Sequence, residues 1–178
     1  FIVPNGNTRT ENNVQVIGFH SNVKSRIQRM KETVNQVLEE ALKVKADIYH
    51  LHDPELLRIS KKLKSINGAK VVFDSHEDVP KQILDKYWIP VMFRKLISKL
   101  YSYHEKRACK KIDGVVSVTP IICERFSKFH SNVEMIANYP QIKIEEGQLS
   151  EKIHNHICYI GGLYESRGLR EVIPVSYT

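Results

Sequence analysis

The chain has 178 residues, of which 42% are hydrophobic and 26% are charged. This composition is typical of a soluble globular domain and excludes intrinsic disorder, a collagen-like fibre and a disulfide scaffold. Lys and Arg number 27 against 20 Asp and Glu, so the formal net charge is +7. Such a surplus favours phosphate-bearing ligands, nucleic acid or anionic lipid as partners, without choosing among them.

The sequence also limits where the protein works. Its apolar runs are far shorter than the roughly 20 residues that cross a bilayer. Cys109, Cys123 and Cys158 are odd in number and widely spaced, unlike a disulfide framework or a Cys-x-x-Cys metal site. We therefore expect a reducing, cytoplasmic setting. Because the opening Phe-Ile-Val-Pro is neither a start nor a signal peptide, we expect a fragment of a longer protein.

Strand and helix patterns alternate along most of the chain. Strands are predicted over residues 14–19, 47–51, 70–74, 114–118 and 133–137. Helices are predicted over residues 27–41, 55–66, about 90–110 and after Pro120, with a turn around residues 78–80. This order predicts an α/β fold with a doubly wound, mostly parallel sheet and right-handed crossovers.

Polar side chains gather at the predicted carboxyl ends of these strands, where open α/β sheets bind ligands. They are His50, His52, Asp53 and Glu55; Ser75, His76, Glu77 and Asp78; Thr119 and Pro120; and Asn138 and Tyr139. A single histidine after a buried strand is often only a hydrogen-bonding structural residue. Three histidines converging from separate strands favour a functional site.

Other kinds of site are less favoured by the pattern. A metal could take His50 and His52 with ligands from residues 76–78, but zinc sites usually use helical spacing or paired cysteines. No Gly-x-Ser-x-Gly elbow, Walker loop or Gly-x-Gly-x-x-G is present. The Gly-rich turn at residues 161–168 could bring backbone and Arg167 to a diphosphate, although Gly-Gly turns are commonly only turns.

Several segments carry a family resemblance. They are His-Leu-His-Asp-Pro-Glu at 50–55, Asp-Ser-His-Glu-Asp-Val-Pro at 74–80, Asp-Gly-Val-Val-Ser-Val-Thr at 113–119, Ile-Ala-Asn-Tyr-Pro at 136–140 and Tyr-Ile-Gly-Gly-Leu at 159–163 with Arg167-Gly168. In this order they resemble the group 1, or family 4, glycosyltransferases of the retaining GT-B type. That fold has two Rossmann-like domains, the first holding mainly the acceptor and the second mainly the nucleotide-sugar donor.

The resemblance implies a domain division. Residues 1–140 correspond to the first Rossmann-like domain without its first strand and helix, so that Phe-Ile-Val-Pro is its second strand. Residues 141–155 are then a linker and residues 156–178 the start of a truncated second domain. The donor-gripping glutamate pair would lie beyond the chain. We therefore expect the 178 residues alone to be inactive.

The resemblance also assigns roles to residues. His76 matches the catalytic histidine near the transferred sugar, and Arg167 matches a cation on the donor diphosphate, beside Gly161 and Gly162. Gly162 stands where many members have a second cation. A general cleft-facing role is expected for His50, His52, Asp53, Glu55, Glu77, Asp78, Thr119 and Asn138. The nucleotide sugar is a substrate, so no cofactor and no metal are expected.

Three functions compete at this point. The resemblance favours a glycosyltransferase with a sugar or lipid-linked acceptor, in surface polysaccharide or glycolipid synthesis. A GT-B-type sugar-nucleotide epimerase shares the architecture. A non-enzymatic basic module for anions or nucleic acid ranks last, because aromatic platforms interleaved with Lys and Arg are missing from the sequence.

The segment at 86–111 has eight basic residues and one acidic residue, Glu105. On a helix, its apolar stripe is Phe93, Leu96, Ile97, Leu100, His104 and Ala108, with Lys95, Lys99, Lys106 and Lys110 opposite. We expect the stripe to pack on the sheet and the lysines to face solvent. With Trp88, Ile89, Val91 and Met92 upstream, this face could bind an anionic membrane surface at the inner side of the cell membrane.

Overall fold

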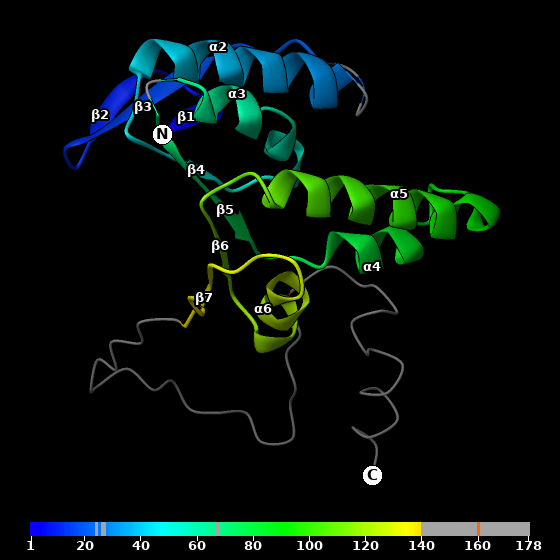
Figure 1. Cartoon of the computed structure of the whole chain (residues 1–178). Coiled ribbons are helices and arrows are strands. Elements are labelled where there is room, and N and C mark those ends of the chain that lie inside the picture. Colours follow the sequence, from blue (N-terminus) through cyan, green and yellow to red (C-terminus); the bar gives the residue numbers. More distant parts are fainter. Residues whose placement is uncertain (24, 26–27, 67, 140–159, 161–178) are drawn as a thin grey trace, which may run out of the picture. The chain divides into compact units, whose positions relative to one another are not determined.

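The computed structural model describes residues 1–23, 25, 28–66, 68–139 and 160 (Figure 1). Residues Phe1–Asn138 form one compact unit. The expected linker at 141–155 lies outside the described residues, as does the expected second-domain segment at 156–178 apart from Ile160.

The centre of this unit is a four-stranded, all-parallel sheet. Its strands, in spatial order, are β4 (Ile48–Leu51), β5 (Lys70–Ser75), β6 (Gly114–Ser117) and β7 (Val133–Met135). The helical connections are η2 (Pro54–Arg58) and α3 (Ser60–Lys64), then α4 (Val79–Asp85) and α5 (Val91–Cys109), then α6 (Pro120–Ser127). This arrangement confirms the predicted Rossmann-like α/β class.

One face of the sheet carries the hydrophobic core. Parallel strands alternate their side chains, so Tyr49, Leu51, Val71, Phe73 and Val115 all point to the same side. They cluster with buried residues of the surrounding helices: Val34, Leu38, Ala41, Leu57, Leu63, Cys109, Ile122 and Phe126. The opposite face of β4 is left more open, with Ile48 and His50 both exposed.

A second, three-stranded sheet forms at the beginning of the chain. It consists of β1 (Ile2–Pro4), β2 (Arg9–Glu11) and β3 (Val14–Phe19), and the helical segment η1 (Arg29–Thr33) and α2 (Val34–Val44) follow it. β1 runs parallel to β3, whereas β2 is antiparallel to it. Asn12 and Asn13 both have positive φ and make the turn between β2 and β3.

Two of the predicted local elements differ from the structure. Asp78 accepts a hydrogen bond from the Lys81 N–H and caps α4, which carries Pro80 in its first turn. The predicted turn at 78–80 is therefore wrong, because these residues are the cap and first turn of a helix. The single predicted helix at 55–66 is divided into η2 and α3.

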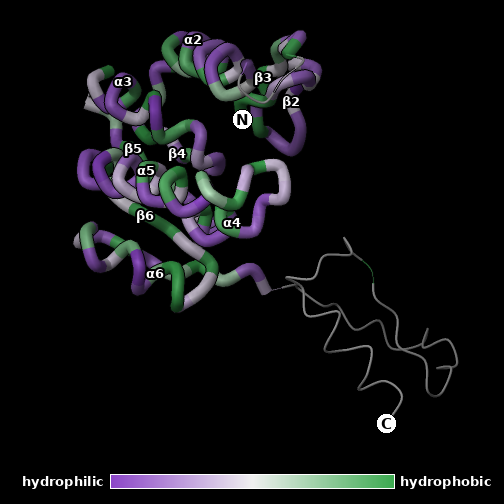
Figure 2. Tube along the Cα trace, turned by 90° about the vertical axis from the view of Figure 1, so that its right-hand side faces the viewer, coloured by the Kyte–Doolittle hydropathy of each residue, from purple (hydrophilic) through white to green (hydrophobic). Residues whose placement is uncertain are grey.

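The orientation of α5 differs from the prediction. Phe93, Leu96, Ile97 and Leu100 are exposed, and the two buried residues of α5 are Glu105 and Cys109. Of the predicted stripe, only Ala108 packs partly against the core. The expectation that the apolar stripe packs on the sheet is therefore wrong. Hydrophobic and hydrophilic residues alternate along α4 and α5 (Figure 2).

Hydrogen bonds explain why the polar side of α5 faces inward. The guanidinium of Arg94 donates to the carbonyls of Ile89, at 2.8 Å, and Leu84, at 3.1 Å. The Ser98 hydroxyl donates to the Pro80 carbonyl at 2.7 Å. These bonds hold α5 alongside α4 (Figure 1). They satisfy carbonyls at both ends of α4 and in the connection after it, which a leucine or phenylalanine could not do.

Farther along α5, a buried ion pair joins it to α6. Glu105 is 0% exposed and accepts two hydrogen bonds from the Arg125 guanidinium, of which the Nη2–Oε1 bond measures 3.3 Å. Arg125 Nε also lies 3.6 Å from Asp78 Oδ1, at the cap of α4. Burial raises the pKa of the Glu105 carboxyl, and Arg125 opposes that rise. The Arg125 guanidinium thus links the start of α4, through Asp78, to the second half of α5, through Glu105, and to α6, on which Arg125 lies.

We expect Arg125→Met to lower the free energy of unfolding by roughly 3–5 kcal/mol, because it leaves the buried Glu105 carboxylate unpaired. The double variant Glu105→Leu with Arg125→Met should recover most of that loss, since both charges are gone. Urea unfolding followed by circular dichroism measures both. A double variant that is as unstable as the single one would show that the loss comes from packing instead.

No helix among the described residues is both long and apolar enough to cross a membrane.

Candidate functional site

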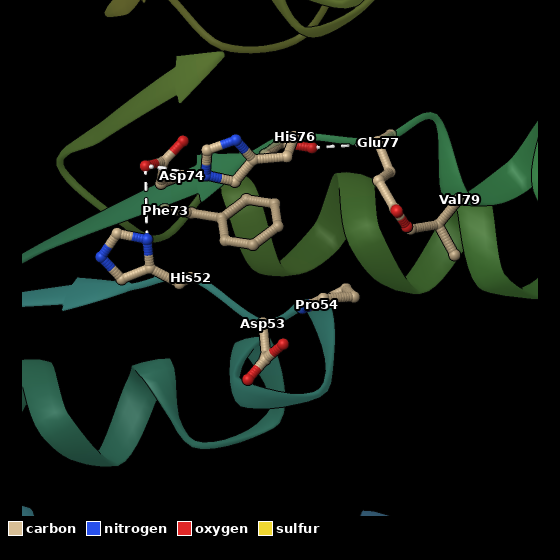
Figure 3. A pocket seen from close by; sticks show the side chains of 9 residues that line it. His52, Asp53, Pro54, Phe73, Asp74, His76, Glu77 and Val79 are labelled. Carbon is tan, nitrogen blue, oxygen red and sulfur yellow. Dashed lines mark hydrogen bonds and ion pairs between the residues drawn. The ribbon is translucent and has the colours of Figure 1, made fainter. Parts of the chain in front are cut away.

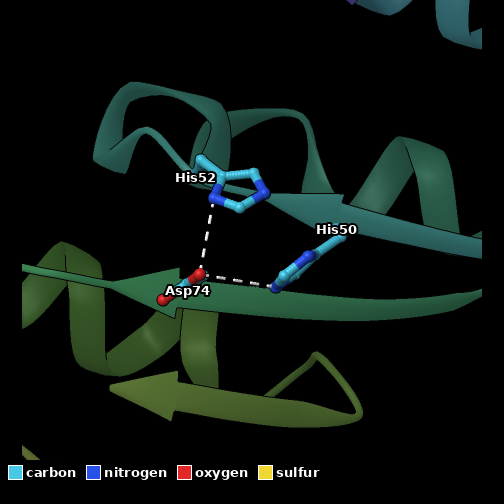
Figure 4. A group of neighbouring side chains, drawn as sticks. All are labelled: His50, His52 and Asp74. Atoms are coloured by element: carbon cyan, nitrogen blue, oxygen red, sulfur yellow. Dashed lines mark ion pairs between the residues drawn. The ribbon is translucent and has the colours of Figure 1, made fainter. Parts of the chain in front are cut away.

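The register of β4 against β5 brings polar residues together. His50 stands opposite Val72 and Leu51 opposite Phe73, so the next position, His52, is level with Asp74. Because side chains alternate along a strand, His50, His52 and Asp74 share the face opposite the core. Figure 4 shows both imidazoles turned toward the Asp74 carboxylate.

One oxygen of Asp74 is approached by three histidines. Asp74 Oδ2 lies 3.8 Å from His50 Nε2, 3.4 Å from His52 Nδ1 and 3.2 Å from His76 Nε2. Asp74 itself is only 8% exposed, and its Oδ1 has no hydrogen-bond partner among the described residues. We call these four residues the Asp74 cluster.

The histidines of the cluster influence one another. Partial burial lowers the pKa of His50, the neighbouring His52 lowers it further, Asp74 acts in the opposite direction, and His76 adds to the lowering. The lowered pKa favours the neutral form of His50, in which one ring nitrogen has a lone pair.

The tautomer of His76 follows from its two partners. Its Nδ1 lies 3.5 Å from the Asn138 side-chain nitrogen, which can only donate a hydrogen bond. This contact and the Asp74 carboxylate together favour the neutral tautomer in which Nδ1 accepts and Nε2–H faces Asp74. A carboxylate behind an imidazole is the usual way to fix which nitrogen is free to face a ligand.

A pocket of about 240 Å³ opens at the carboxyl ends of β4 and β5 (Figure 3). Its walls are His52, Asp53, Pro54, Phe73, Asp74, Ser75, His76, Glu77 and Val79. Two hydroxyl bonds brace the wall: Ser75 donates to the Glu77 carbonyl at 3.2 Å, and Ser117 of β6 donates to the Ser75 carbonyl at 2.7 Å. The pocket is thus built on strands as well as loops.

The structure brings some of the predicted site residues together and leaves others apart. The pocket is lined by four of them, His52, Asp53, His76 and Glu77. His50 contacts Asp74 of the pocket wall, and Asn138 contacts His76. Glu55, Asp78 and Thr119 do not line it. Glu55 lies in η2, Asp78 caps α4, and the Thr119 hydroxyl accepts the Ile122 N–H and caps α6.

Gly161, Gly162 and Arg167, predicted for the diphosphate, lie outside the described residues.

Asp74 is the site residue that sequence reasoning missed. It follows Val71, Val72 and Phe73 in a strand predicted to be buried, and a carboxylate in such a run needs a partner. The spacing of Asp74 and His76, two residues apart at the end of a strand, also places them on one side of the chain. These two signals together could have identified Asp74 as the centre of the cluster.

Comparison with known proteins identifies the family of the chain. Residues 1–139 match the family described as Glycosyltransferase Family 4. No curated protein matches the chain. The family match covers far more than half of the 178 residues, including every strand in the part of the chain that the structure describes and all residues of the pocket. The chain therefore belongs to glycosyltransferase family 4.

Proposed function

We propose that the protein transfers a sugar, with retention, from a nucleotide-sugar donor to a sugar or lipid-linked acceptor in surface polysaccharide or glycolipid synthesis. The observation that carries the proposal is the pocket at the strand ends, with His76 held between Asp74 and Asn138 in a chain of family 4. A pocket at this edge of a parallel sheet is where an α/β protein binds its ligand.

His76 is suited to bind a sugar hydroxyl. With Nε2–H directed at the Asp74 carboxylate, Nδ1 is the acceptor that the ring presents to the pocket. The 3.5 Å contact with Asn138 is long and exposed, so a sugar hydroxyl can replace it at little cost. The buried Asp74 carboxylate, in contact with Nε2 at 3.2 Å, strengthens Nδ1 as an acceptor and places negative charge near the oxocarbenium-like centre that forms beside the ring.

The departing diphosphate needs cations and backbone N–H groups. In the proposed mechanism Arg167 supplies the charge, and Gly161 and Gly162 let the backbone approach the phosphates, as the family resemblance implies. Closure of two domains over the donor would exclude the water that otherwise hydrolyses it. Incubation with nucleotide sugars and analysis of the product separates transfer to an acceptor from epimerisation.

Replacing His76 tests the proposed catalytic residue. In a protein that carries both predicted domains, we expect His76→Ala to lower kcat by roughly 10² or more, because contacts to the transition state are lost. Stability should change little, since the side chain is 39% exposed. Steady-state kinetics and thermal unfolding measure the two effects. His104→Ala, an exposed histidine of α5, is the matched control.

The opposite pattern would contradict the assignment. A His76→Ala variant that unfolds more easily, but has unchanged kcat in its folded fraction, would make His76 a structural residue.

The proposal for the acceptor side includes docking to an anionic membrane. Between α4 and the middle of α5 the exposed surface is apolar, with Met92 78% and Val91 73% exposed. We call this surface the α5 apolar face: Tyr87, Trp88, Val91, Met92, Phe93, Leu96 and Leu100. Ile89, expected to contribute, is buried. So many exposed large apolar side chains on one helix and the connection before it favour an interaction site.

Cations continue the same face toward the end of α5. Tyr103, Lys106, Arg107, Lys110 and Lys111 line a second pocket of about 330 Å³. Residues 96, 100, 103, 107 and 110 follow at helical spacing, so apolar and basic surface adjoin on one side of the helix. An amphipathic helix with aromatic and aliphatic residues beside lysines is typical of binding in the plane of an anionic membrane.

Vesicle co-sedimentation tests the docking. We expect the chain to bind anionic vesicles and release them at high salt, because each lysine near the surface contributes about 1 kcal/mol. Changing Lys95, Lys99, Lys106 and Lys110 to Gln should weaken binding strongly, and so should Val91→Ser with Met92→Gln. A matched control changes four lysines on other helices to Gln: Lys43, Lys61, Lys62 and Lys128.

Equal binding by the two lysine variants, or no binding at low salt, would contradict a specific role for α5.

A further inference from the structure

The Asp74 cluster has the composition of a transition-metal site. One ring nitrogen of His50, one of His52 and a carboxylate oxygen of Asp74 all lie within 4.8 Å of one another. We propose that these three residues bind a divalent cation of the zinc class. The proposal does not rest on the glycosyl transfer proposed above, and it assigns the ion no part in that reaction.

The distances fit such an ion. Zinc bonds of about 2.0–2.1 Å in tetrahedral geometry put neighbouring donor atoms about 3.3 Å apart. Asp74 Oδ2 is already 3.4 Å from His52 Nδ1 and 3.8 Å from His50 Nε2. Rotation of the two imidazoles closes the remaining gap, and both side chains are about half exposed and free to turn. The fourth position is left for water.

The strands place the three donor residues next to one another, so only side-chain rotation is needed. His50 is on β4 and His52 is the first residue after it, while Asp74 is on the adjacent β5. Hydrogen bonds between the strands fix the backbone of His50 and Asp74, and His52 follows directly from the end of β4. Asp74 is buried, while both histidines reach solvent, which gives an ion a path to the carboxylate. Unlike a cluster of exposed acidic groups, this site joins two separate strands around a buried oxygen.

The donor types favour zinc over magnesium. Two imidazole nitrogens and one carboxylate suit Zn²⁺, Co²⁺ or Ni²⁺, whereas Mg²⁺ and Ca²⁺ require mostly oxygen ligands. His76 has an outer role, because its Nε2 contacts the same Asp74 oxygen at 3.2 Å and can orient the carboxylate from behind.

The test is direct binding by the untagged chain. Co²⁺ should produce the visible absorption bands of a four-coordinate site, and Zn²⁺, but not Mg²⁺, should remove them. We expect His50→Gln and His52→Gln each to weaken Zn²⁺ binding by more than about 10²-fold, measured against a chromogenic chelator. His76→Gln, which changes an outer contact, should weaken it only roughly tenfold. Both ligand histidines are half exposed, so these variants should still fold.

Controls separate this site from the other histidines. His104→Gln, and a double change of His154 and His156 to Gln outside the described residues, should leave the Zn²⁺ affinity unchanged. The proposal is overturned if the Co²⁺ bands do not appear, if His50→Gln binds as tightly as the unaltered chain, or if the His154 and His156 double variant loses binding. Sugar transfer enters none of these measurements, so its failure would leave them unaffected.

Discussion

The rest of the site depends on one buried carboxylate at the end of a central strand. Asp74 lies on β5, which is paired on both edges, and it is almost wholly enclosed. A lone carboxylate in such a place is costly unless donors surround it. Because side chains alternate along the chain, His50 of β4 and His52 just after it both face Asp74. The turn after β5 brings His76 to the same oxygen. The need to satisfy Asp74 therefore explains why three histidines converge here. Their ring nitrogens give the pocket its hydrogen-bonding groups, and the Asp74 carboxylate gives it a buried group that attracts cations.

A second constraint acts on α5, where hydrogen bonding decides the orientation. Arg94, Ser98 and Glu105 each find a buried or partly buried partner on the inner side of the helix. Turning the helix to bury Phe93 and Leu96 would break these bonds and expose carbonyls of α4 to an apolar neighbour. Each buried polar group left without its partner would cost about 1–3 kcal/mol, and a charged group more, which is of the same order as the roughly 1.5–3 kcal/mol gained by burying one apolar side chain. Apolar surface is left outside as the consequence.

The sequence predicted most of the fold but only part of the site. Strands such as residues 70–74 were predictable because an apolar run between turn residues has few other uses, and the α/β class followed from their alternation with helices. β2 was missed because Arg9–Glu11 is polar and exposed, so only the Asn12 and Asn13 turn marked it. Helical periodicity showed which residues of α5 share a face, but not which face turns inward, since that depends on distant carbonyls. Asp74 was missed because two of its three partners, His50 and His52, belong to another strand and its end.

The pocket and the α5 apolar face are mechanically connected. The chain leaves the pocket at Glu77, enters α4 through its cap at Asp78, and reaches α5 within a short connection. Arg94 and Ser98 bind α5 back onto α4, and Arg125 ties the Asp78 cap to Glu105. If the α5 apolar face docks on a membrane, this bracing holds the pocket at a fixed height above the lipid surface. An acceptor anchored in the same membrane then needs to be found only in two dimensions, and the reach of its headgroup decides which acceptors can enter the pocket.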